Sequence, residues 1–226
     1  MPLIVLEGLD GAGKSTQVKL LIKMLEDQGG QVEYIHFPRF DAPVYGDMVA
    51  RFLRGEFGEM GDVSPYIVAL LFAGDRADAG PMIRRWLEEG KFVVLDRYVN
   101  SNIAYQCAKL DDAVQRQELH DWIIDTEYGH FNIPKPDISL FLDVPFEFTE
   151  RNLTAAREGA DRDYLNGGRD IHEESLSLQR RVRDMYLWIA LQDDNLYVID
   201  CSDGNGAMSS PEANFRKVSD HISRFL

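Results

Sequence analysis

Cysteine and long hydrophobic runs are scarce in this sequence. Only Cys107 and Cys201 occur among its 226 residues, too few for a disulfide framework and not at the spacing of a zinc site. The longest apolar run, residues 66–73, has eight residues, whereas a membrane helix needs about 18. Residues 1–6 show neither a basic segment nor a cleavage signal. We therefore expect a cytoplasmic protein that does not span a membrane.

Basic residues are also in the minority. Lys and Arg total 24 against 38 Asp and Glu, which gives a net charge of −14. A general nucleic-acid binder, or a protein that docks on an anionic membrane, needs a basic face. We therefore expect neither nucleic acid nor a membrane as a partner. A few arginines can still form one basic pocket for a small anionic ligand.

Short apolar runs recur along the chain, and most of them end in an acidic or glycine-containing turn. Continuous runs of this kind are typical of strands that are buried on both faces of a parallel sheet. They occupy residues 3–6, 32–37, 92–95, 138–142 and 196–199.

Helical periodicity separates these runs. Apolar residues repeat at the helical period over residues 18–25, before Gly29 and Gly30, and again over residues 178–189. Residues 64–89 predict one long helix with a candidate break at Gly74 or Pro81. The alternation predicts a single α/β domain over residues 1–226, with a parallel five-stranded sheet, helices on both faces, and functional residues at the carboxyl ends of the strands.

A phosphate-binding loop follows the first predicted strand. The segment matches G-x-x-x-x-G-K-[ST] at every fixed position and opens a helix, which is the context that the motif requires. Its backbone N–H groups and the helix N-terminus favour phosphate, Lys14 can reach the β- and γ-phosphates, and Ser15 can bind Mg²⁺. This motif predicts a P-loop NTPase-type fold. The residues predicted to bind ATP are Gly8, Leu9, Asp10, Gly11, Ala12, Gly13, Lys14, Ser15 and Thr16.

Two features narrow the class of P-loop protein. The chain is short for an assembled motor ATPase, and it lacks the Asn-Lys-x-Asp element with which regulatory GTPases read guanine. A small kinase fits both observations.

A second polar group follows the third predicted strand. Asp96 can hold Mg²⁺ directly or through water, and Arg97 can clamp a phosphate with its forked guanidinium. Arg97, Ser101 and Tyr105 then repeat at helical spacing, with Asn102 one position away. The alternative is a capped helix with polar surface residues.

Two weaker signals precede this group. Phe72 and Arg76 lie one helical turn apart, so they can stack on a planar base and hydrogen-bond its edge, although Phe72 can equally belong to the core. Arg39, just after Phe37 and a proline, is a further anion ligand.

A polar, arginine-rich segment lies between the fourth strand and the last long helix. Residues 157–169 are flanked by glycines, and we predict a small mobile lid over about residues 156–170. A lid excludes the water that would otherwise accept a phosphoryl group. The alternative is a solvated loop.

Together these segments resemble the thymidylate kinase family. The matching pieces occur in the order of the family across nearly the whole chain: residues 7–16, 37–39, 71–76, 96–102 with Tyr105, and 134–137. The resemblance implies transfer of a phosphoryl group from ATP to thymidine 5′-monophosphate (dTMP), with Mg²⁺ as the cofactor and a homodimer in which the long helix takes part.

The resemblance also implies roles for individual residues. Phe72 stacks on thymine, while Arg76 and Asn102 read its edge. Arg39 and Arg97 hold the acceptor phosphate, and Tyr105 lies under the deoxyribose. The remaining predicted substrate ligands are Asp10, Phe37, Ser101, Asp163 and Tyr164; the predicted metal ligands are Ser15, Asp96 and Asp10; the predicted catalytic residues are Lys14, Arg97, Asp10, Arg157 and Arg162.

One position sorts the members of the family. Some carry an arginine inside the phosphate loop, where this chain has Gly11, and others place the catalytic arginine in the lid. This sequence is similar to the second, bacterial-type arrangement, with Arg157 and Arg162 as candidates. Two other functions stay open at this point: a related kinase with another acceptor, and a non-catalytic P-loop protein that regulates a partner.

Overall fold

Five parallel strands form one sheet in the order β2–β3–β1–β4–β5. The computed structural model describes residues 1–154, 164–165, 170–173 and 175–225. All five predicted strands are present, so the predicted five-stranded parallel sheet is confirmed. Their bounds are β1 Leu3–Gly8, β2 Val32–His36, β3 Phe92–Asp96, β4 Ile138–Asp143 and β5 Leu196–Asp200.

The first strand lies at the centre of the sheet, between two strands that come later in the chain. Leu6 of β1 is in register with Asp96 of β3 on one side and with Leu140 of β4 on the other. The strands β1, β3 and β4 are buried along nearly their whole length, which is why their sequences are continuously apolar. The carboxyl ends of β1 and β3 therefore meet at one edge, where connections diverge and parallel sheets bind ligands.

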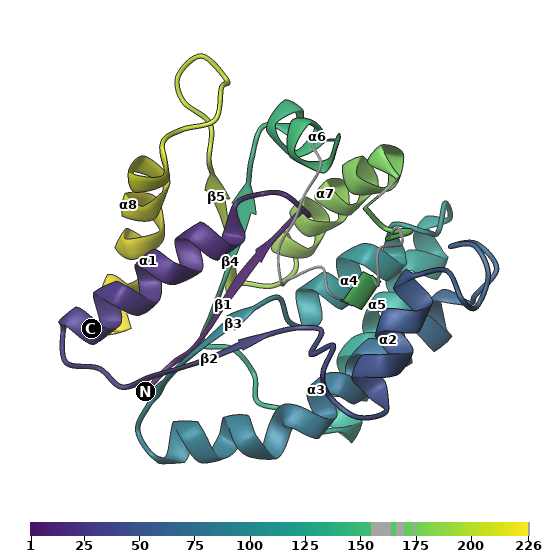
Figure 1. Ribbon diagram of the computed structural model, residues 1–226, viewed down its shortest axis with the longest axis horizontal. Coiled ribbons are helices and arrows are strands. Elements are labelled where there is room, and N and C mark those ends of the chain that lie inside the picture. The colour runs from purple at the N-terminus through teal and green to yellow at the C-terminus, as the bar shows by residue number, and fades with distance from the viewer. Residues whose placement is uncertain (155–163, 166–169, 174, 226) are drawn as a thin grey trace.

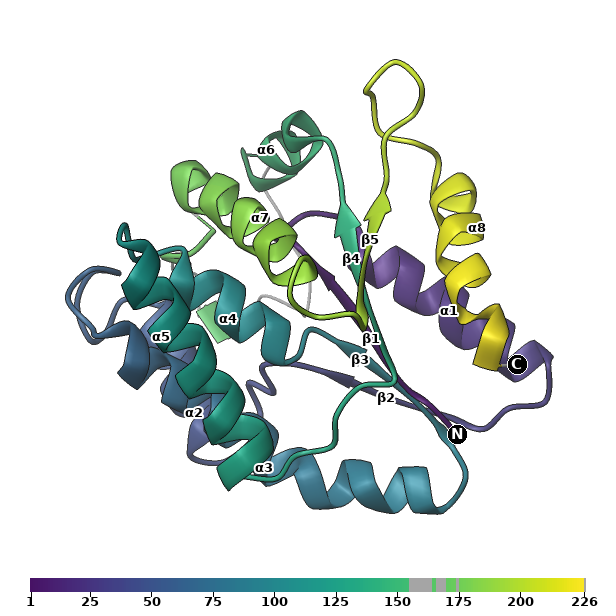
Figure 2. The same cartoon turned by 180° about the vertical axis from the view of Figure 1, so that it is seen from behind.

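Helices cover both faces of the sheet. Figure 1 shows α1 and α8 on one side and α3, α4 and α7 on the other, and Figure 2 shows the same layers from behind. The helix α2 packs on α3, and α5 packs on α4. The bounds are α1 Lys14–Asp27, α2 Tyr45–Leu53, α3 Pro65–Glu88, α4 Val99–Cys107, α5 Ala113–Ile124, α6 Phe146–Thr154, α7 Leu176–Ala190 and α8 Pro211–Ile222, with a π-helix, η1, at Asp125–His130 and a 3₁₀ turn, η3, at Ser223–Phe225.

The helix α3 runs without a break through Gly74 and Pro81, so the candidate break at these residues is wrong. Proline removes one backbone hydrogen bond from the helix. Ala79 and Ile83, on either side of Pro81, are nevertheless fully buried in the main core. Tertiary packing therefore outweighs the local preference. Gly74 serves close packing instead, because a Cβ there would collide with the ring of Tyr45 from α2.

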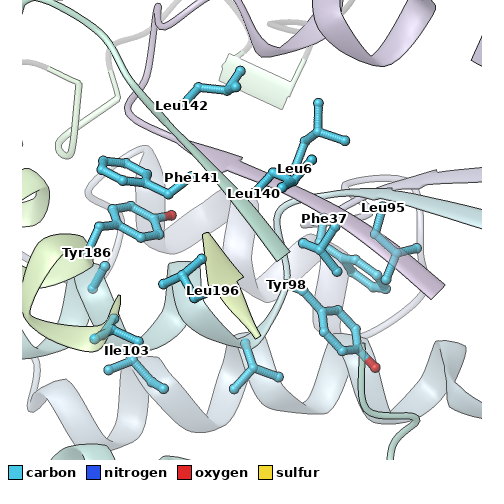
Figure 3. Close-up of a cluster of buried hydrophobic side chains, with 14 of the residues drawn as sticks. Leu6, Phe37, Leu95, Tyr98, Ile103, Leu140, Phe141, Leu142, Tyr186 and Leu196 are labelled. Atoms are coloured by element: carbon cyan, nitrogen blue, oxygen red, sulfur yellow. The ribbon is translucent and has the colours of Figure 1, made fainter. Parts of the chain in front are cut away.

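The main hydrophobic core supports the functional edge of the sheet. Figure 3 shows side chains from the central strands packed against residues of α4 and α7. Among them the rings of Phe141 and Tyr186 stack with their centroids 4.3 Å apart. This stack matters for function because the hydroxyl of Tyr186 reaches the polar site described below.

None of the helices in the described part of the chain combines the length and the apolar character that crossing a bilayer requires.

Candidate active site

A cleft of about 1240 Å³ opens at the carboxyl edge of the sheet. It brings most of the predicted site residues together, from segments far apart in the sequence. The predicted residues that line it are Asp10, Gly11, Ala12, Gly13, Lys14, Ser15, Phe37, Arg39, Phe72, Arg76, Asp96, Arg97, Ser101, Asn102, Tyr105 and Tyr164.

A few predicted residues are not part of this lining. Gly8 and Leu9 are buried behind the loop, and the exposed Thr16 follows it on α1. Arg157, Arg162 and Asp163, with most of the predicted lid, lie outside the described residues, so their placement stays a prediction.

The phosphate loop is shaped by left-handed glycines. Gly11 and Gly13 have φ angles of 74° and 79°, a backbone conformation that residues with a Cβ adopt only at a cost. Behind them, Nζ of Lys14 donates to the carbonyl oxygen of Leu9 at 3.0 Å. Burial, with help from the nearby Arg97, lowers the pKa of Lys14 to about 8. The loop therefore holds an ammonium group that gains from any anion placed beside it.

Asp10 joins the phosphate loop to the opposite wall of the cleft. Its carboxylate accepts from Nη2 of Arg97 at 2.6 Å, from the hydroxyl of Tyr105 at 2.6 Å and from Nε2 of Gln179 at 2.9 Å. Burial would raise the pKa of Asp10, but the charges of Arg97 and Lys14 hold it well below its ordinary range. The carboxylate is thus ionised, and both of its oxygens accept hydrogen bonds. Gln179 was not predicted.

Glu7 supports the second polar group, which begins at Asp96 and Arg97. The sequence analysis assigned Glu7 no role. Its carboxylate accepts from the Tyr98 backbone at 3.0 Å, the Ser101 hydroxyl at 2.6 Å and the Tyr186 hydroxyl at 2.9 Å. These bonds surround the turn at Arg97, whose φ angle is 69°. Burial raises the pKa of Glu7. The sequence signal that could have indicated this role is the position of Glu7, an acidic residue at the end of a buried strand.

Asp96 offers a free ligand atom to the cleft. Its Oδ1 is buried and has no hydrogen-bond partner among the described residues, while Oδ2 lies 3.5 Å from Nδ1 of His36. Burial opposes ionisation, but Lys14 and His36 lower the pKa of Asp96 overall. Ser15 lines the same cleft and is exposed. A charged oxygen with no partner among the described residues, in the same cleft as a serine of the phosphate loop, is suited to a divalent cation.

The far end of the cleft combines a ring, a guanidinium and an amide. Phe72, Arg76 and Asn102 line it together. Arg76 is almost completely buried and forms an ion pair with Glu127, which the sequence analysis missed. Burial alone would lower the pKa of Arg76, but Glu127 raises it. This wall can therefore present fixed hydrogen-bonding groups to a planar ligand.

Arg39 lines the cleft but is not a free cation in this structure. Its Nε donates to Asp75 at 2.9 Å, and Nη2 donates to Asp78 at 2.7 Å. Asp75 also accepts from the backbone N–H of Arg39 at 2.8 Å. The two aspartates, which the sequence analysis did not single out, tie the turn after β2 to α3. An anion at Arg39 would share the guanidinium with them.

Tyr164 closes one side of the cleft. Its ring stacks on Phe40 at 3.7 Å, and its hydroxyl donates to Asp170 at 2.5 Å. Burial, with the charge of Asp10, raises the pKa of Asp170 to about 7. His172, also unpredicted, stacks on Tyr105 at 5.3 Å. These contacts place Tyr164, a described residue of the predicted lid, beside the loop before α2, and His172, just after the predicted lid, beside α4.

A phosphate loop that faces a second basic and aromatic pocket across one cleft defines a P-loop phosphotransferase, because the two reactants of phosphoryl transfer must meet in line. A family model described as thymidylate kinase matches residues 6–209. The chain belongs to the thymidylate kinase family.

Individual relatives agree with this placement. The chain is 36% identical over 191 residues to a thymidylate kinase from Mycobacterium tuberculosis, which covers 84% of this chain and 86% of that one. It is 35% identical over 158 residues to the human thymidylate kinase, and the match covers 70% of this chain and 65% of the human one. Among solved structures, thymidylate kinase from Candida albicans superposes with a TM-score of 0.74 at 27% identity, covering 99% of this chain and 91% of that one.

Proposed function

We infer that this protein is a kinase that transfers the γ-phosphoryl group of ATP to dTMP and so forms dTDP. The observation that carries this conclusion is the cleft itself, which is lined both by the phosphate loop and by Phe72, Arg76 and Asn102, and in which Arg97 donates to Asp10 of the loop. Family membership supports the same reaction.

We propose the following division of work. The loop N–H groups and Lys14 hold the phosphates of ATP, and Arg97, with Arg39, holds the phosphate of dTMP. Phe72 stacks on thymine, and Tyr105 lies beneath the sugar. The attacking phosphate oxygen is already ionised, so the protein supplies alignment and positive charge rather than a general base.

Mg²⁺ fits the donor set at the loop. The Oδ1 of Asp96, for which the described part of the chain supplies no partner, and the hydroxyl of Ser15 would hold it. Both oxygens of Asp10 already accept hydrogen bonds, so we propose that Asp10 acts on the ion only through water. When bound, the ion supplies charge neutralisation at the β- and γ-phosphates.

We propose that the chain is one kinase domain with a lid over about residues 156–170, which brings Arg157 or Arg162 to the transferred phosphoryl group. Asp163 and Tyr164 would close over the nucleotide. The stacked Tyr164 supports this, since it already contacts the cleft wall.

An acceptor screen tests the function. ADP release from Mg·ATP should be fastest with dTMP among nucleoside monophosphates and free nucleosides. A ribonucleotide or an unphosphorylated nucleoside that outran dTMP would make the protein a different kinase. Binding of ATP without turnover of any acceptor would favour a non-catalytic P-loop protein.

ATP binding should take up protons near pH 8. The pKa of Lys14 is about 8 in the free protein, so in about half of the molecules the Lys14 side chain is a neutral amine at that pH. The phosphates favour the charged form, raise this pKa and draw a proton from solution. Calorimetry in buffers of different ionisation enthalpy should show an uptake of about half a proton at pH 8 and much less at pH 6.5, where Lys14 is already charged. Uptake that persists in Lys14→Met would assign the proton to another group.

We propose that the protein is a homodimer through α3. Ile67, which is 54% exposed, and its neighbours Tyr66 and Leu70 form an apolar patch on this helix. Light scattering should give twice the mass of one chain, and Ile67→Asp should give one chain mass because it buries a charge in the interface. Leu191→Asp, at another exposed position, is the control and should stay dimeric. A monomeric wild type would refute the dimer.

We further propose that the enzyme works in the cytoplasm. Cys107 and Cys201 are free and buried, and burial raises the pKa of each thiol to about 12. Unreactive thiols of this kind suit a reducing compartment. The acidic net charge likewise favours no nucleic-acid or membrane partner.

A further inference from the structure

A fully buried carboxylate, Glu127, lies behind the base end of the cleft and has no part in the roles assigned above. It belongs to the π-helix η1, a rare form of helix that concentrates at functional sites. Its backbone carbonyl accepts from the N–H of Ile133 at 3.1 Å, so the turn is held against the segment that follows. A charge buried so deeply requires partners, and it has two.

The first partner is Arg76. Nε donates to Oε2 of Glu127 at 2.5 Å, and Nη2 donates to Oε1 at 2.7 Å. This two-point contact fixes the plane of the guanidinium. It engages one edge of the group and leaves Nη1 outside the pair. Because Arg76 lines the cleft, its remaining N–H groups are donors for a ligand there.

The second partner is Asn102, whose amide nitrogen has two acceptors. Nδ2 donates to Oε1 of Glu127 at 2.9 Å and to the carbonyl oxygen of Ala69 at 3.0 Å. A carboxylate and a carbonyl only accept, so the amide can face them only with its nitrogen. Oδ1 points the other way and has no hydrogen-bond partner in the described part of the chain. Both residues line the cleft, so a ligand there can meet an acceptor at Asn102 and a donor at Arg76.

We propose that Glu127 decides which pyrimidine this kinase accepts, by holding Asn102 with its acceptor outward and Arg76 with its donor outward. Thymine presents N3–H and O4, which match this pair. Cytosine presents a lone pair at N3 and an amino group at C4, which oppose it. Glu127 touches no substrate and is a positioning residue. The inference rests on the proposed function, because it assumes that the base of the acceptor binds here.

The test is the selectivity of Glu127→Gln between two acceptors. The new amide brings an NH₂ group against the donors of Arg76 or Asn102, so their fixed orientation is lost. We expect the ratio of kcat/KM for dTMP to that for dCMP to fall at least about 10-fold, mainly through the KM for dTMP. The ratio of kcat/KM for dTMP to that for dUMP should not change, since uracil has the same N3–H and O4. Each ratio is measured on one preparation, so the active fraction cancels.

Two further variants complete the design. Asp125→Asn removes an exposed carboxylate from the same π-helix and should leave every ratio unchanged. Glu127→Asp keeps a charge for Arg76 but withdraws the carboxylate by one methylene, so it should also lower the dTMP to dCMP ratio, and it carries the test if Glu127→Gln does not fold. An unchanged ratio in a folded Glu127 variant overturns the inference. A wild type that does not prefer dTMP overturns the proposed function instead.

Discussion

Arg97→Ala should reduce kcat/KM for dTMP by about 10³-fold and leave ATP binding almost intact. The side chain lies between the two halves of the cleft, 2.6 Å from Asp10 and 3.1 Å from the hydroxyl of Ser101. We propose that its forked guanidinium holds the acceptor phosphate in line. Steady-state kinetics with dTMP, together with equilibrium binding of an ATP analogue, separates the two effects.

The backbone at Arg97 requires a second variant. Its φ angle of 69° costs any residue with a Cβ about 1 kcal/mol. The wild-type arginine bears this strain while its side chain is held by Asp10 and Ser101, and the alanine variant keeps the strain without these bonds. Arg97→Gly relieves that strain and should show the same loss of turnover. Arg85→Ala, which removes an exposed guanidinium from α3, should be silent. If ATP binding falls as far as turnover does, Arg97 does not act on the acceptor side.

Lys14→Met should lower kcat/KM for ATP by about 10²- to 10³-fold. The ammonium group is buried in the phosphate loop, where a charge acts on the phosphates with little screening by water. Methionine fills nearly the same space, so thermal unfolding should show an intact fold. The measurement is turnover against ATP concentration at saturating dTMP.

Lys23→Met is the matched control for this variant. Lys23 lies on the same helix but is exposed and pairs with Asp27 at 2.8 Å. Its loss should not change turnover. A Lys14 variant that keeps wild-type turnover would remove this residue from phosphate binding.

The fold could be predicted well because its signals are local. The strands β1, β3 and β4 are buried on both faces and therefore read as unbroken apolar runs. The loop of Gly11, Gly13 and Lys14 is contiguous, so a single motif describes it. The break expected in α3 failed because burial of Ala79 and Ile83 is a tertiary effect. The helix α5 went unpredicted because it carries no clear apolar stripe. The helix α2 has an apolar face, but it went unpredicted because its nine residues give a short pattern.

The supporting residues of the site could not be predicted for a related reason. Glu127 meets Arg76 across 51 positions, and Gln179 meets Asp10 across 169. Neither belongs to a motif, and each is an ordinary polar residue until the chain folds. The spacing of side chains that face the ligand was informative, whereas the groups that orient them were visible only in three dimensions.

The hydrogen bonds of Asp10 have a consequence for how each substrate affects the binding of the other. It belongs to the loop predicted to hold the donor, yet its carboxylate is bound by Arg97 and Tyr105 from the acceptor wall. We therefore expect occupation of one half of the cleft to change the free energy of ligand binding in the other half. Such linkage is reciprocal: the factor by which ATP changes the affinity for dTMP equals the factor by which dTMP changes the affinity for ATP. A single shared carboxylate makes the two sites one thermodynamic unit.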